Sequence, residues 1–131
     1  MGRGLSHYRS DDACEWRAIS LLRLSTAEVG VVLVYVTLNT LAEGQQLADL
    51  LFTHKLANCV NFHPITCTYL WEGQQTTEPE IVAIIKTEAT LFDAIVATVK
   101  ELVPYTNFIG QLEVSRVNEA FAAWMESVVQ A

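Results

Sequence analysis

The sequence lacks the short motifs that mark the common classes of enzyme. It contains no phosphate-binding G-x-x-x-x-G-K loop, no dinucleotide-binding G-x-G-x-x-G turn, no zinc-binding H-E-x-x-H helix and no G-x-S-x-G nucleophile turn. No pair of carboxylates has a spacing that would require acid–base chemistry. We therefore expect this protein not to be an enzyme.

Cysteine and long apolar runs are also scarce. Three cysteines, without a C-x-x-C pair and without any Asn-x-Ser/Thr site, are typical of a reducing compartment, so we expect a cytoplasmic protein. The longest apolar runs, such as VVLVYV at 31–36, are far too short to cross a bilayer. Residues 18–25 resemble the core of a secretion signal, but Arg23 interrupts them and acidic residues precede them, so we expect no signal peptide.

Basic residues are outnumbered, with 8 Lys and Arg against 15 Asp and Glu, and the net charge is −7. Residues 1–29 contain four basic and four acidic residues, whereas residues 30–131 contain four basic and eleven acidic residues. An acidic body disfavours nucleic acid and anionic membrane surfaces as partners. Because residues 1–29 are also aperiodic and polar at their start, we expect a poorly ordered N-terminal extension followed by one domain, 30–131.

From residue 31 onward, β-branched apolar segments alternate with segments of helical periodicity. The predicted order is strand, helix, two strands joined in a hairpin, helix, strand and a last helix. This order predicts an α+β fold, a ferredoxin-like βαββαβ sandwich with an additional C-terminal helix. The segments are 31–38, 39–58, 59–75, 80–88, 87–103 and 107–115, with the hairpin turn at 72–79 and the last helix after 118.

Polar side chains mark the expected helix starts. Thr40 and Glu43 fit a capping box, in which the hydroxyl accepts from the first turn and the glutamate reaches back. Thr87 or Thr90 fits the cap of the second helix, and Asn118 fits the cap of the last one.

Two strands are apolar on both faces. In this fold the helices cover one face of the sheet, and an open second face should make its strands alternate between apolar and polar residues. The segments at 31–36 and 81–85 do not alternate. Each large side chain left exposed would forgo about 1.5–3 kcal/mol of burial. We therefore expect the chain to associate with further copies of itself, unless the C-terminal helix alone covers the second face.

The stretch NCVNFHPITC places Cys59, His63 and Cys67 at intervals of four residues, and each is a possible metal ligand. A regular strand would point all three to one face, with neighbours about 13 Å apart at about 3.3 Å per residue. Ligands of a transition metal lie about 2.0–2.3 Å from it. Two of the three meet only if the chain bends sharply at Pro64 or another strand or subunit contributes; otherwise Pro64 marks an edge strand. Packing residues, an intersubunit metal site and a reactive thiol stay open as alternatives.

Three further side chains are candidates for a binding site. Lys86 ends a buried strand and either meets an anion in a cleft or reaches solvent. Tyr69 and Trp71 share a face beside the hairpin turn, where bare aromatic rings indicate packing, an interface or ligand stacking.

Several of these segments together resemble the CutA family of divalent-cation-tolerance proteins. The family shows an Ala-Cys-Val-Asn strand, a Tyr-x-Trp-Glu-Gly-Lys hairpin, an Ile-Lys-Thr strand end and a His-Pro-Tyr-Glu turn. Here the corresponding segments are NCVN at 58–61, YLWEGQ at 69–74, IKT at 85–87 and VPYT at 103–106. The resemblance covers about 100 residues, from 31 to 129, in the same order.

The resemblance implies a ferredoxin-like homotrimer with clefts between its subunits, in agreement with the strands that are apolar on both faces. It implies a role in the response to and tolerance of divalent metal ions, with copper or a similar cation bound weakly and Cys59, His63 and Cys67 as candidate ligands. Similarity to PII-type signalling trimers gives the alternative of a small-molecule-binding or scaffold trimer with an anionic ligand. The expected cleft residues are Asn61, Tyr69, Trp71, Lys86 and Tyr105.

The sequence departs from the family pattern at the expected cleft. The histidine and glutamate of the turn are Val103 and Thr106, and the hairpin lysine is Gln74. These changes remove polar and ligating groups, which indicates a divergent member that keeps the assembly and has lost or changed its ligand. His63 replaces the missing histidine only if the fold brings it to the same cleft.

Overall fold

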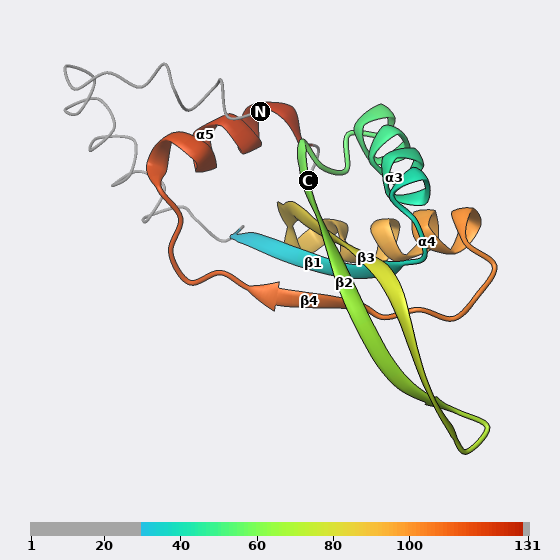
Figure 1. Ribbon diagram of the computed structural model, residues 1–131. Helices are drawn as coiled ribbons and strands as arrows, with labels where there is room; N and C mark the ends of the chain where they lie inside the picture. Colours follow the sequence, from blue (N-terminus) through green and yellow to red (C-terminus); the bar gives the residue numbers. More distant parts are fainter. Residues whose placement is uncertain (1–29, 130–131) are drawn as a thin grey trace.

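The computed structural model describes residues 30–129, so the expected extension 1–29 lies outside the described residues. The elements follow the predicted order (Figure 1). No helix within the described range is long and apolar enough to cross a membrane. The strands are β1 (Val31–Leu38), β2 (Cys59–Trp71), β3 (Gln74–Glu88) and β4 (Ile109–Glu113), the helices are α3 (Leu41–Thr53), α4 (Phe92–Leu102) and α5 (Glu119–Val128), and a short 3₁₀ helix is η2 (Ala89–Leu91).

The four strands form one antiparallel sheet in the order β2-β3-β1-β4. The helices α3 and α4 pack against each other and lie on one side of this sheet (Figure 1). The predicted ferredoxin-like βαββαβ fold with an additional C-terminal helix is therefore confirmed. Because β2 is an edge strand, it accommodates Pro64 without a break, which confirms the edge-strand alternative for this residue.

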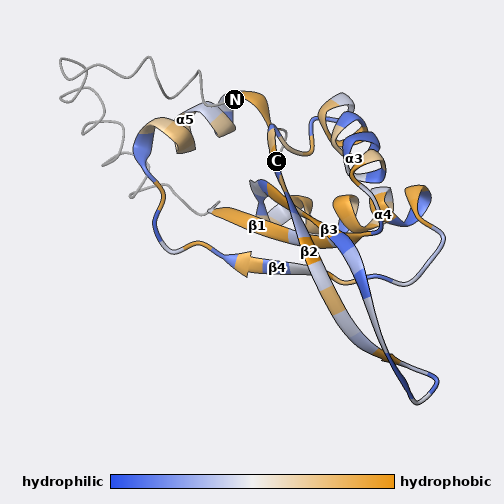
Figure 2. Ribbon diagram, viewed as in Figure 1, coloured by the Kyte–Doolittle hydropathy of each residue, from blue (hydrophilic) through white to orange (hydrophobic). Residues whose placement is uncertain are grey.

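The central strand β1 alternates between fully buried and half-buried residues. Its fully buried side chains pack in one core with side chains of both helices, and Figure 2 shows the strand as hydrophobic. Burial of this row accounts for much of the stability of the sheet, at about 1.5–3 kcal/mol for each large side chain. The core residues of β1 are Val32, Val34, Val36 and Leu38, each at most 1% exposed, and those of the helices include Leu47, Leu51, Ile95 and Val99.

Helix α5 covers part of the second face of the sheet. Lys86 pairs with Leu33, out of phase with the buried row of β1, so both side chains lie on the face opposite the core. The ammonium of Lys86 lies 5.4 Å from the ring centroid of the buried Phe121 in α5. Tyr35 and Ile84 pair farther along the same face and are only half-buried. The helix thus covers one end of this face, and an apolar remainder stays accessible on the single chain.

Strands β2 and β3 continue beyond the rest of the sheet as a two-stranded arm, residues 65–80 (Figure 1). β1 pairs with β3 from Ile81 to Glu88, whereas β2 pairs with β3 back to Gln74. The connection is a two-residue turn, in which Glu72 and Gly73 have φ of 51° and 78°. Positive φ at both positions is the geometry of the turns that join tightly twisted hairpins.

The predicted hairpin turn over 72–79 is wrong for residues 74–79, which are paired strand. Polar side chains suit a ribbon exposed to water on both faces as well as they suit a loop, so composition alone does not separate the two. Figure 2 shows the tip of the arm as hydrophilic.

The predicted start of the first helix is confirmed. The hydroxyl of Thr40 accepts from the backbone N–H of Glu43 at 3.2 Å. The carboxylate of Glu43 accepts from the backbone N–H of Asn39 at 2.9 Å, one residue before the cap itself. The helix ends at Thr53, earlier than predicted, and Lys55 has a φ of 57° where the chain turns away.

Of the predicted caps of the other two helices, the position of Asn118 is confirmed, whereas Thr87 and Thr90 are wrong. Thr87 is buried in β3, where its hydroxyl donates to the carbonyl of Leu56 at 2.6 Å. α4 follows η2 directly, and no side chain, Thr90 included, makes a capping hydrogen bond to it. Asn118 stands at the N-cap of α5, but its side chain makes no capping hydrogen bond either.

Gly44 supplies the close contact between α3 and β2, and its replacement tests that packing. A Cβ at this position would lie 2.6 Å from Cε1 of Phe62. Alanine normally stabilises a helix by about 1 kcal/mol relative to glycine, but overpacking against a ring costs about 1–3 kcal/mol. We expect Gly44→Ala to lower the free energy of unfolding by about 1 kcal/mol, measured by urea denaturation.

The matched control removes the ring. In a Phe62→Ala background, Gly44→Ala should raise the free energy of unfolding, because only the helix preference remains. An increase in stability from Gly44→Ala in the wild-type background would contradict the close contact.

Candidate functional site

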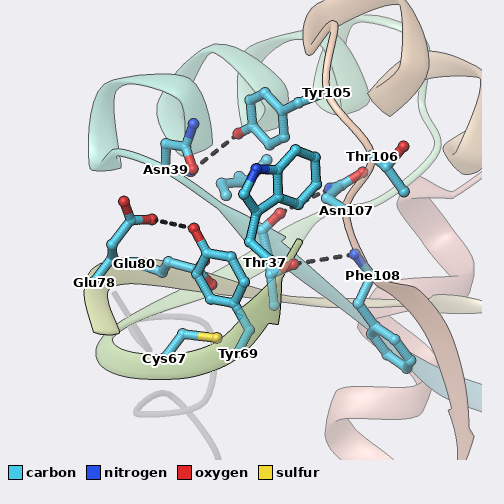
Figure 3. Close-up of a pocket in the computed structure, with 12 residues that line it drawn as sticks. Thr37, Asn39, Cys67, Tyr69, Glu78, Glu80, Tyr105, Thr106, Asn107 and Phe108 are labelled. Carbon is cyan, nitrogen blue, oxygen red and sulfur yellow. Dashed lines mark hydrogen bonds between the residues drawn. The ribbon is translucent and has the colours of Figure 1, made fainter. Parts of the chain in front are cut away.

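A hollow of about 620 Å³ lies where the end of β1, the arm and the segment between α4 and β4 meet (Figure 3). Its volume falls in the range of about 300–1,000 Å³ that small-molecule sites occupy. One wall comes from residues 37–39, one from the arm and one from residues 105–108. The lining residues are Thr37, Leu38, Asn39, Cys67, Tyr69, Trp71, Glu78, Glu80, Tyr105, Thr106, Asn107 and Phe108.

Tyr105 joins the segment after α4 to the start of α3. Its hydroxyl donates to Oε1 of Glu43 at 2.7 Å. The same hydroxyl accepts from the backbone N–H of Asn39 at 3.0 Å (Figure 3). Burial, and after it the hydrogen bond to Glu43, raises the pKa of Tyr105 to about 12. The phenol of Tyr105 is therefore neutral. It donates its hydrogen bond to the carboxylate of Glu43, which also accepts at the start of α3.

Thr37, at the end of β1, forms hydrogen bonds with the segment before β4. The amide nitrogen of Asn107 donates to the carbonyl of Thr37 at 2.7 Å, and the backbone N–H of Phe108 donates to the hydroxyl of Thr37 at 3.1 Å. The backbone N–H of Thr37 donates in turn to the carbonyl of Phe108 at 3.1 Å. These bonds hold residues 107 and 108 in a fixed position at the rim of the hollow (Figure 3).

The arm contributes a thiol and two carboxylates from one face. Cys67 pairs with Glu78, and Glu80 follows two residues later, so the three side chains share a face. The hydroxyl of Tyr69 donates to Oε1 of Glu78 at 2.8 Å. Burial, followed by the charge of Glu80, raises the pKa of the Cys67 thiol, and the bond to Glu78, followed by burial, raises the pKa of Tyr69. The thiol and phenol on this wall are held in their protonated forms.

The three predicted metal ligands lie on one face of β2 but at separate places. Cys59 is buried at the start of the strand, His63 is exposed farther along, and Cys67 lines the hollow. The strand runs through Pro64, so no bend brings two of them together. In the described part of the chain, no group of three or more His, Cys, Asp or Glu side chains could hold a metal ion.

The structure brings together three of the five predicted cleft residues. Tyr69, Trp71 and Tyr105 line the hollow. Asn61 pairs with Ile84 on the half-buried part of the second face, away from the lining residues. Lys86 lies against α5 and does not line the hollow.

Sequence reasoning missed Glu78, Glu80 and Asn107 as site residues. The two glutamates alternate along a strand in the same register as Cys67, but the polar run around them predicted a turn and concealed that alternation. The place of Asn107 depends on its bond to Thr37, 70 residues earlier, and no local pattern indicates such a contact.

Comparisons with known proteins agree on one family. The sequence model of the family described as CutA1 divalent ion tolerance protein matches residues 32–128. The divalent-cation tolerance protein CutA of Archaeoglobus fulgidus is 32% identical over 98 residues, which make up 74% of this chain and 96% of that protein. Protein CutA 1, chloroplastic, of Oryza sativa subsp. japonica is 38% identical over 84 residues, 63% of this chain and 48% of that protein.

Solved structures give the same result at the level of the fold. The structure of the periplasmic divalent cation tolerance protein CutA from Archaeoglobus fulgidus has a TM-score of 0.74 at 31% identity, covering 76% of this chain and 99% of that one. The crystal structure of CutA1 from Oryza sativa has a TM-score of 0.73 at 33% identity, covering 76% of this chain and 94% of that one.

The hydrogen bond between Tyr105 and Glu43 predicts a pH dependence of stability. Because burial, and after it the bond to Glu43, raises the pKa of Tyr105 from 10.0 to about 12 on folding, the buried neutral phenol contributes fully to stability below about pH 10, and this contribution is lost as the pH rises toward 12. We expect Tyr105→Phe to lower the urea midpoint near neutral pH. The difference between wild type and variant should shrink above about pH 10.

Tyr35→Phe is the control for loss of a tyrosine hydroxyl. Tyr35 contacts Phe108 through its ring, and phenylalanine keeps that ring. A difference between wild type and Tyr105→Phe that stays constant up to about pH 12 would contradict the role given to the hydroxyl.

Proposed function

We propose, because this chain belongs to the CutA1 divalent ion tolerance family, that it acts in the cellular response to divalent metal ions by binding copper or a similar cation weakly. The observation that supports a site for such an ion is the face of the arm, where Cys67 lies beside two carboxylates. A thiolate is a soft ligand that favours copper, and carboxylate oxygen completes mixed sites for divalent ions. The protein would act as a binding protein in the cytoplasm and not as an enzyme.

The same proposal includes a homotrimer. A two-stranded ribbon alone is marginally stable in water, and Leu70 and Trp71 near its tip are 74% and 64% exposed in the single chain. Leu112 on β4 is 49% exposed and pairs with Leu33, on the face that α5 covers only in part. Association that covers the arm and this face removes both apolar surfaces from water.

Cys67 is the cysteine whose surroundings best fit a metal ligand. Cys59 is 7% exposed and packs in the apolar core cluster, where a divalent ion would lose its hydration without gaining other ligands. Cys67 lines the hollow next to Glu78 and Glu80. Since no three such side chains within residues 30–129 are arranged so that they could hold a metal ion by themselves, the remaining ligands would be water or side chains of a second copy.

The alternative of a PII-like trimer with an anionic ligand has less support. Lys86, the basic residue on which that alternative depends, packs against Phe121 instead of lining the hollow. The side chains that do line it include two glutamates, which repel an anion.

Copper titration of the reduced full-length chain tests the proposal. We expect Cys67→Ser to weaken binding of Cu²⁺, and of redox-inert Zn²⁺ measured in parallel without oxygen, by about tenfold or more. Cys59→Ala should bind like the wild type. Because the pKa of Cys67 is raised, its proton competes with the metal, and affinity should increase as the pH rises from about 6 to 8.

Each variant is first checked for an unchanged thermal unfolding transition. Equal affinity of the wild type, Cys67→Ser and Cys59→Ala would remove both thiols from the account of metal binding.

A further inference from the structure

The arm, residues 65–80, lacks the interactions that hold the rest of the described chain in place (Figure 1). None of its residues is buried, and none belongs to the hydrophobic core. Its side-chain hydrogen bonds, from Thr68 to Thr77 and from Tyr69 to Glu78, join one strand of the arm to the other. In the described part of the chain, no helix and no third strand forms a hydrogen bond with it. A two-stranded ribbon of this kind is marginally stable by itself.

The turn and the composition of the arm weaken it further. Glu72 has a φ of 51°, which is unfavourable for a residue with a side chain, and two-residue turns favour Asn, Asp or Gly there. Residues 74–78 are polar, so no buried face fixes the register in which the two strands pair. Leu70 and Trp71 are 74% and 64% exposed. In a single chain the arm therefore gains little that compensates for the conformational entropy lost on ordering.

Association supplies the burial that the arm lacks. A second copy that covers Leu70, Trp71 and the neighbouring second face of the sheet removes this apolar surface from water. Segments that cannot bury enough apolar surface alone become ordered when they bind. We propose that the arm becomes ordered only when a second copy of the chain covers it, so that the metal-binding face it carries forms in the assembly and not in the single chain.

This inference rests on the proposed function, because Cys67, Glu78 and Glu80 all lie on the arm. Cys67 belongs to β2 and the two glutamates to β3, so an arm whose strands separate holds them at no fixed distance from one another. A site that is absent from the open chain binds metal only at the expense of the free energy needed to form it. Metal binding and assembly then strengthen each other by the same factor.

Hydrogen exchange of the full-length chain, resolved along the sequence, tests the ordering of the arm without any metal. Leu112→Lys places a charge on the second face but outside the arm, at a residue that is 49% exposed. We expect this variant to sediment as a monomer. Its arm amides should exchange about 100-fold faster than those of the assembled wild type, whereas those of β1 should change less than about tenfold.

Phe52→Lys is the matched control. Phe52 is 45% exposed on α3, which lies on the other side of the sheet (Figure 1). This variant should stay assembled and keep slow exchange in the arm.

Leu70→Ser combined with Trp71→Ser is the second dissociated variant, used if Leu112→Lys fails to fold or stays assembled. Both of its changes lie near the tip of the arm. The amides of 65–68 and 77–80, which are next to the domain, then report on the order of the arm.

Titration of the reduced chains with Zn²⁺ tests the link to metal binding. We expect the assembled wild type to bind Zn²⁺ about tenfold or more tightly than Leu112→Lys, although Leu112 is not on the arm. Saturating Zn²⁺ should in turn shift Leu112→Lys toward larger species in sedimentation.

The possible failures are distinguishable. Arm exchange that is as slow in a monomeric variant as in the assembled wild type overturns the inference, and so does equal Zn²⁺ affinity of the two forms. If neither form binds Zn²⁺, the proposed metal function fails, and hydrogen exchange still decides whether association orders the arm. A wild-type chain that sediments as a monomer contradicts the homotrimer and this inference together.

Discussion

The structure depends on the pairing of β3, a strand with two different sets of neighbours along its length. From Ile81 to Glu88 it lies between β1 and β2, and its apolar residues complete the core. From Gln74 to Glu80 its partner among the described residues is β2 alone. The first part is stabilised by burial under two helices, whereas the second is a ribbon that is marginal in water. One strand therefore contributes both to the stable domain and to the arm, which is marginally stable without a partner.

The candidate site follows from the same strand. Its arm carries Cys67, Glu78 and Glu80 to one side of the hollow, while the domain supplies Tyr105 from the other side. Glu43 links the start of α3 to the wall of the hollow. Its carboxylate accepts from the backbone N–H of Asn39 before the helix and from the hydroxyl of Tyr105. Fold stability and the wall of the hollow thus share a carboxylate.

Much of the fold could be predicted from the sequence, because its signals are local. The β-branched run at 31–38 and the Thr40–Glu43 cap are read directly from neighbouring residues, and both are present. Only part of the arm could be predicted from the sequence. Residues 74–78 are polar and mostly exposed in the single chain, and polarity of this kind predicts a turn equally well.

The candidate site was less predictable, because its parts meet through long-range contacts. Tyr69 and Trp71 were indicated by their shared face beside the turn, and Tyr105 by the resemblance to the family. The partnership of Tyr105 with Glu43 joins residues 62 positions apart, and no local pattern indicates it. The regular spacing of Cys59, His63 and Cys67 indicates a common face, and it does not indicate that one is buried and another exposed. Burial on the second face depends on α5, which arrives from the end of the described chain.

Sedimentation velocity of the full-length chain at a few micromolar tests the central claim, that the arm and the second face of the sheet are covered by further copies. The account predicts a single species of three times 14.6 kDa, about 44 kDa, and a loss of that species when Leu70 and Trp71 are both replaced by serine. A wild-type chain that sediments as a stable 14.6 kDa monomer at this concentration would contradict it.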